Sequence, residues 1–125
     1  ASNLLCKNAL LDEARSIFAG LIRVEENAQH SDAYQTNRNL LLSEGSRATA
    51  LPNLEIEADD VRCSHGATIG QVDNTQLFYL MSRGLTQRQA ERLLVFGFFD
   101  EVLGRLPMAG VRERIRGAIE EKIGL

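Results

Sequence analysis

The sequence predicts an α+β fold in which strands come first and helices follow. Up to about residue 72, apolar residues occur in strand-length segments, and one of these shows a clear two-residue period. After residue 73, apolar residues recur at the spacings of three and four that are typical of helices. Because the two patterns do not interleave, we expect the helices to gather at one end. The expected domains are residues 1–72 and 73–125.

The first half reads as brief strands separated by polar loops. In the segment LEIEAD, Leu54 and Ile56 face one way and Glu55 and Glu57 the other. The spacing of the segments is irregular and no repeat is visible, so a sandwich, a barrel and a β-solenoid all remain open. The expected strands are 16–25, 39–44 and 54–59, and the expected loops are 26–32, 43–48 and the LPN of 51–53.

Three helices are predicted after residue 72. Asp73 followed by Gln76 has the form of a capping box, and Gly84 is well placed to end that helix. Thr86 followed by Gln89 repeats the signal for a second helix. This second helix is expected to run towards Leu106, before Pro107, and the third to cover 111–125 with a stripe of Val111, Ile115, Ala118 and Ile119.

The second predicted helix carries apolar residues on two sides. Ala90, Leu93, Leu94 and Gly97 form one stripe, and Val95, Phe99, Val102 and Leu106 form another on roughly the opposite side. A helix with two apolar sides either packs between neighbouring elements or presents one side to a partner. Both interpretations remain open at this point.

Composition excludes several classes of function. The chain has 125 residues and a net charge of −3 without a basic block, so nucleic-acid binding has no electrostatic support. No apolar stretch is long enough to span a membrane, and no glycine-rich phosphate loop occurs. The start without Met fits an excised piece of a longer chain. Cys6 and Cys63, far apart and without a secretory leader, suggest reduced thiols in the cytoplasm.

The stretch VRCSHGATIG, residues 61–70, places Cys63 and His65 two positions apart. On an extended strand they share one face, with Cα atoms about 6.5–7 Å apart. Thiol and imidazole suit zinc, copper or iron–sulfur species, but two ligands cannot complete a tetrahedral site. The other obvious ligands, Cys6 and His30, are distant in sequence. The pair is therefore a structural core pair, a thiolate–imidazolium pair, or a half-site completed by another subunit.

Four motifs give the chain a family resemblance: NLLLS, LEIEADDV, CSHGATIGQVD and QLFYLMSRGL, all within residues 35–85. This run resembles the C-terminal region of the SufB/SufD family, subunits of the SUF iron–sulfur cluster assembly system. The resemblance implies the last coils of a right-handed parallel β-helix, followed by a C-terminal helical region. Arg38 stands where SufB has a cysteine, and Gly66 stands where SufB has a glutamate, which favours the SufD branch.

The resemblance also implies a non-catalytic scaffold role. Such a subunit pairs with a SufB-like paralogue through terminal strands and docks a SufC-like ABC-type ATPase through its C-terminal helices. A transient iron–sulfur cluster, not stably bound to this chain alone, would form at the SufB–SufD interface. His65 matches the family's key histidine and Cys63 the cysteine of the same motif. The expected docking residues are Val95, Phe96, Phe99, Val102 and Leu106.

Two other functions compete with the scaffold role. One is a stand-alone metal-binding protein that uses Cys63 and His65 in a homodimer. The other is a small cysteine-dependent enzyme. As an isolated piece, the chain is also expected to self-associate through its exposed strands.

Overall fold

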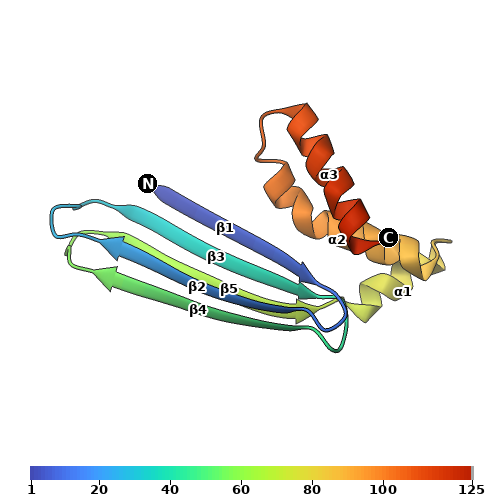
Figure 1. The fold of residues 1–125 in the computed structure, drawn as a ribbon. Helices are drawn as coiled ribbons and strands as arrows, with labels where there is room; N and C mark the ends of the chain where they lie inside the picture. The colour runs from blue at the N-terminus through green and yellow to red at the C-terminus, as the bar shows by residue number, and fades with distance from the viewer. Residues whose placement is uncertain (125) are drawn as a thin grey trace. The chain divides into compact units, whose positions relative to one another are not determined.

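The computed structural model describes residues 1–124, so only the last residue of the expected third helix lies outside the described residues. The chain folds into two compact units, one from Ala1 to Gly70 and one from Gln71 onward. Strands precede helices (Figure 1), which confirms the predicted α+β class. Along residues 1–124 the elements are β1 (Ser2–Leu10), β2 (Arg15–Val24), β3 (Asp32–Leu41), β4 (Arg47–Ile56), β5 (Arg62–Gln71), α1 (Asn74–Ser82), α2 (Gln87–Leu103) and α3 (Ala109–Ile123).

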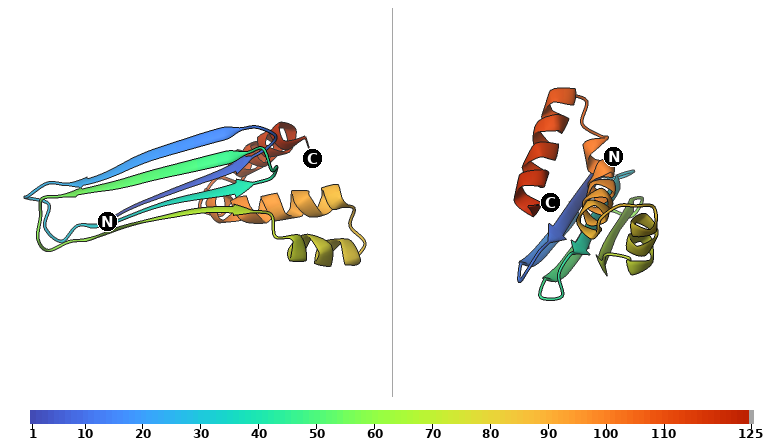
Figure 2. Two further views of the ribbon diagram at one scale, coloured as in Figure 1. Left: turned by 90° about the horizontal axis from the view of Figure 1, so that it is seen from below. Right: turned by 90° about the vertical axis from the view of Figure 1, so that its right-hand side faces the viewer.

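The strands alternate between two sheets as the chain proceeds. Within the described residues, one sheet has the order β1-β3-β5 and the other pairs β2 with β4 (Figure 2). β1 and β3 are parallel, and Ser2 pairs with Ala33. β2 and β4 are also parallel, and Arg15 pairs with Arg47. The chain therefore returns to each sheet after nearly the same length.

The strands are longer and more regular than the sequence suggested. Each has nine or ten residues, and β1 has no counterpart among the expected segments. The loop expected at LPN is wrong, because β4 continues through Pro52. Proline has no N–H to donate, so it is confined to edge strands, and β4 pairs with β2 alone among the described strands. The expected segment 39–44 is also misplaced, since β3 runs from Asp32 to Leu41.

Gln35 shows how closely the two sheets approach. Its side chain is 3% exposed, and a Cβ atom built on Gly20 in the facing sheet would overlap the Gln35 amide. Along β2, residues on the side of Gly20 are buried or half-buried, and those of opposite parity are exposed. A glycine at this position therefore makes room for the amide between the sheets.

Capping interactions begin the first two helices where the sequence predicts. The Asp73 carboxylate accepts a hydrogen bond of 2.8 Å from the Thr75 N–H at the start of α1, but among the described residues Gln76 does not complete the predicted capping box. Thr86 and Gln89 form a capping box: the Gln89 N–H donates to Thr86 Oγ1 and the Thr86 N–H donates to Gln89 Oε1. α2 ends at Leu103, short of the expected Leu106, with Gly104 as its C-cap.

α2 lies between its two neighbours in the helical unit. It packs against α1 on one side, and α3 is joined to it by ion pairs, Arg92 with Glu120 and Arg116 with Asp100. The guanidinium carbons of Arg92 and Arg116 lie 5.7 and 4.9 Å from the centre of the Phe96 ring. This arrangement supports the interpretation in which α2 packs between other elements.

We predict that Gly20→Ala destabilises the chain by about 1–3 kcal/mol, because a buried amide has to move to admit the new methyl group. Gly70→Ala is the matched control: nothing lies within 4 Å of its added Cβ, so its effect should stay below about 1 kcal/mol. Urea unfolding followed by circular dichroism measures both. Equal effects of the two substitutions would show that the space above Gly20 is not restricted.

Candidate functional site

The candidate site lies on β5, the last strand of its sheet. In the order β1-β3-β5, β5 is paired on one side by β3, and no described strand pairs with its other edge. That edge therefore presents unpaired backbone N–H and C=O groups, which another strand can use.

Cys63 and His65 share one face of β5. Gly66 lies on the opposite face, since a Cβ built there would be 3.1 Å from the hydroxyl of Tyr34. Tyr34 has the opposite parity to Gln35 on β3, so its side of the sheet faces away from β2 and β4. By strand alternation, Cys63 and His65 therefore lie on the face towards the interior. A long side chain at position 66 would be crowded by the Tyr34 ring.

The two candidate ligands differ in exposure. Cys63 is half-buried and carries a free thiol, whereas His65 is exposed. No group of three or more His, Cys, Asp or Glu side chains that could hold a metal ion occurs among residues 1–124. The chain thus brings together two donor side chains on one strand face, fewer than the four ligands of a tetrahedral metal site.

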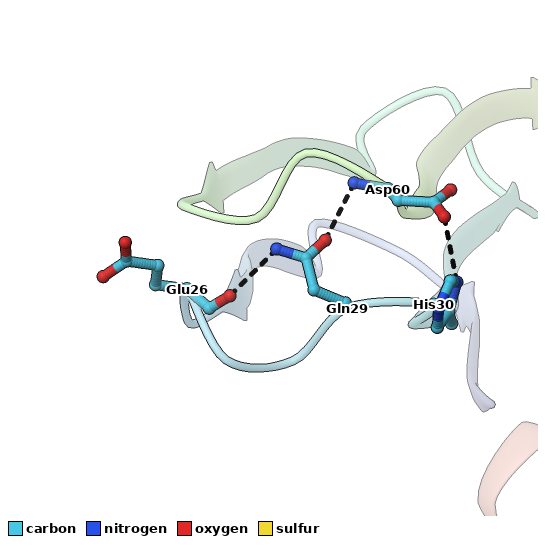
Figure 3. Close-up of polar contacts among 4 residues, drawn as sticks. All are labelled: Glu26, Gln29, His30 and Asp60. Atoms are coloured by element: carbon cyan, nitrogen blue, oxygen red, sulfur yellow. Dashed lines mark hydrogen bonds and ion pairs between the residues drawn. The ribbon is translucent and has the colours of Figure 1, made fainter.

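The other histidine belongs to a turn. His30, at a positive φ of 61°, precedes β3, and its Nδ1 lies 2.9 Å from a carboxylate oxygen of Asp60 in the turn before β5 (Figure 3). Its backbone N–H also donates to the Asp60 carbonyl. The Asp60 N–H donates to the side-chain oxygen of Gln29, whose amide donates to the Glu26 carbonyl. His30 therefore ties together two successive turns and is not a neighbour of Cys63 and His65 on their strand face.

The sequence analysis did not predict a series of hydrogen-bonded asparagine side chains that lies between the sheets. Asn8 donates to Asn39 at 2.9 Å, and Asn39 donates to Asn37 at 2.6 Å and to the Thr68 carbonyl on β5 at 3.3 Å. Asn37 and Asn39 are 1% and 4% exposed. Cys6 pairs in register with Asn37, which places this thiol on the same face of its sheet. The interior behind β5 is therefore polar, and only the alternation of asparagines in NRN could have signalled it.

Two of the buried amides have donors without a partner. Gln35 Nε2 and Asn37 Nδ2 donate no hydrogen bond to any described residue. A buried donor without an acceptor is unfavourable, so these two amides lower the stability of the interior relative to a fully paired one.

The residues expected to dock a partner are largely covered. Val95 and Phe96 are buried, so their side chains do not form part of the surface, and Phe99, Val102 and Leu106 are half-buried. An apolar groove of about 450 Å³ lies instead between α1 and α2. Its lining residues are Thr75, Gln76, Tyr79, Leu80 and Leu94, and exposed apolar side chains of these two helices are Phe78, Tyr79, Met81 and Leu93.

The fold and the site together define a class of protein: a parallel two-sheet domain whose last strand carries a cysteine and a histidine on one face, followed by a helical unit. A family model described as the SufBD core domain of the SUF system for FeS cluster assembly matches residues 1–98. The chain belongs to this SufBD family. No described helix is both long and apolar enough to cross a membrane.

Individual relatives agree with this family. Iron-sulfur cluster assembly protein SufD of Bacillus subtilis is 42% identical over 96% of the chain, and SufD of Escherichia coli is 38% identical over 98%. A SufBD family protein of Mycobacterium tuberculosis is 41% identical over 98%. The matched region covers 28%, 29% and 33% of these three relatives, so the chain spans about a third of their length or less.

We predict that the isolated chain does not retain an iron–sulfur cluster. Cys63 and His65 would supply only two ligands, no group of three or more donors occurs among residues 1–124, and a cluster held by protein side chains needs more. Anaerobic reconstitution with iron and sulfide, followed by desalting and analysis for both elements, measures this. A stoichiometric cluster on the monomeric chain, with its visible charge-transfer absorption, would contradict the half-site.

Proposed function

We propose that this chain is the C-terminal part of a SufD-like scaffold subunit, and that β5 forms one half of a site where an iron–sulfur cluster is assembled. The observation that carries the proposal is the exposed His65 beside Cys63 on a strand with an unpaired outer edge. Thiolates dominate cluster ligation, and a histidine can replace one of them. The cluster is cargo in this role, and the chain itself catalyses no reaction.

The partner at the unpaired edge of β5 is a SufB-like paralogue. A strand of this paralogue adds to the edge through backbone hydrogen bonds, and the side chains next to the new pairing complete the ligand set. The nearly constant length of chain from each strand to its parallel partner supports the view that these strands are coils of a parallel β-helix. We place the assembly in the cytoplasm, where free thiols such as Cys6 and Cys63 stay reduced.

The helical unit docks a SufC-like ABC-type ATPase. The groove between α1 and α2 and the exposed apolar side chains of the same two helices support this role, because they are available to a partner whereas Val95 and Phe96 are buried. An amphipathic or aromatic element of the ATPase can fill such a groove. Nucleotide binding belongs to the ATPase in this arrangement.

The decisive experiment compares His65→Ala with the unaltered chain in the full-length protein, co-expressed anaerobically with its SufB-like and SufC-like partners. We expect the complex to assemble normally and its iron and sulfide content to fall at least about fivefold, because an exposed ligand is lost without harm to packing. Cys63→Ser should have a smaller effect. Iron and acid-labile sulfide per complex are the measured quantities.

His30→Asn is the matched control for His65→Ala. It removes the other histidine while asparagine tolerates the positive φ of that position, so cluster content should stay unchanged. If His65→Ala leaves the cluster content unchanged while the complex forms, the assembly role of β5 is wrong. If zinc in place of a cluster bridges two copies of the chain through Cys63 and His65, the stand-alone metal-binding protein replaces our proposal.

We further predict that Phe78→Glu weakens binding of the SufC-like ATPase at least about tenfold, because a carboxylate replaces an aromatic ring of α1 that is 73% exposed. Arg114→Gln changes the net charge equally on an exposed position of α3 and should leave the affinity unchanged. Isothermal titration calorimetry measures both affinities. Equal affinities for Phe78→Glu and the unaltered protein would place the docking surface elsewhere.

A further inference from the structure

The outer face of the β2–β4 sheet carries an apolar centre that no described residue covers. On this face Ile17 is 76% exposed, Leu21 53% and Leu51 52%. Leu51 pairs in register with Ala19, which lies between Ile17 and Leu21 on β2. The four side chains therefore form one contiguous patch, because residues two apart on a strand and residues opposite on its neighbour share a face.

The two ends of this face carry different charges. At the start of both strands Arg15 lies directly opposite Arg47, and neither forms an ion pair with any described acid. Arg47 donates instead to the backbone carbonyls of Glu44 and Ser46, which leaves its charge uncompensated. Like charges directly opposite each other destabilise a sheet. This end of the face is therefore suited to a carboxylate from outside.

The far end of the same face is rich in carboxylates. Arg23 pairs in register with Glu55, and Arg23 Nη2 lies 3.7 Å from a carboxylate oxygen of Glu57. With one arginine between two glutamates, this end has an excess of negative charge. The face therefore runs from a positive end through an apolar centre to a negative end, a pattern that is complementary to itself when reversed.

We propose that this outer face of β2 and β4 docks on the same face of a second copy of the protein. A two-fold axis that lies between the faces, perpendicular to the strands at Ala19 and Leu51, reverses the strand direction. It places Arg47 opposite the partner's Glu55 at both ends of the interface. It also places Ile17 over the partner's Leu21 and Leu51 over the partner's Leu51.

The remaining charges are compatible with this pairing. Arg15 meets the partner's Arg23, whose charge is already paired with a glutamate. Two sheets packed face to face keep their strands within about 30° of alignment, which allows these contacts along the whole length of β2 and β4. The part of this face that carries the charge pattern is only two strands wide, so we expect a weak dimer with a Kd of about 10 μM or more. This surface is separate from the edge of β5 and does not depend on the function proposed there.

Charge reversal tests the pairing directly in the full-length protein that contains this chain. Arg47→Glu and Glu55→Arg should each weaken dimerisation at least about tenfold, because each brings like charges together across the two-fold axis. The double variant, Arg47→Glu with Glu55→Arg, should restore the Kd to within about threefold of the unaltered value. Sedimentation equilibrium over a range of protein concentrations gives the dissociation constants of the three variants and of the unaltered protein, and the urea midpoint of each variant verifies its fold.

Two further variants complete the design. Glu113→Arg makes the same charge change as Glu55→Arg at an exposed position of α3, outside the strand unit, and should leave the Kd unchanged. Leu51→Asp should abolish the dimer, because it buries a charge opposite its own copy. The proposal is overturned if the unaltered protein is a monomer throughout, if its dimer is insensitive to Leu51→Asp, or if the double variant remains as weak as the single ones.

Discussion

The first unit depends on one constraint, the parallel register that pairs β1 with β3 and β2 with β4. We call the stretch of chain from a strand to its parallel partner one circuit. Because Leu4 stacks on Gln35 and Asn8 stacks on Asn39, each interior position is a column of residues contributed by successive circuits. A change in the length of one turn would shift every column at once. The His30–Asp60 contact lies where two such turns meet, and it joins them by a backbone and a side-chain interaction. The backbone hydrogen bonds of the β1-β3-β5 sheet hold β5 in place, and with it the candidate ligands.

The helices could be predicted well from the sequence, because their signals are local. Asp73 and Thr86 are caps within a few residues of the groups they bind, so no knowledge of the remaining chain is needed. The strands were harder. Pro52 suggested a loop, but a strand paired on one side can lack one donor. The regular spacing between paired strands could not be predicted from the sequence. Residues that pair in register are not alike, since Leu4 pairs with Gln35 and Cys6 with Asn37, so no repeat is apparent.

In the candidate site, too, features set by neighbouring residues could be predicted from the sequence, and features set by the register between strands could not. That Cys63 and His65 share a face follows from a spacing of two on a strand, which the sequence alone can show. The amide chain of Asn8, Asn39 and Asn37 joins residues from different circuits, and only the register brings them together. Likewise, the sequence shows that α2 has two apolar sides, but it does not show that Val95 is buried and Leu93 is exposed. Burial depends on which neighbouring element covers each side of the helix, and the sequence of the helix alone does not specify that neighbour.

The contact between Gly20 and Gln35 also restricts the order in which this sequence can change over evolutionary time. Position 20 admits a side chain only after the amide above it has become smaller or has moved, so the two substitutions are acceptable in one order and deleterious in the other. A lineage that shortened residue 35 first would gain freedom at position 20, at the cost of a gap between the sheets. The two positions, on strands of different sheets, would then diverge as a coupled pair.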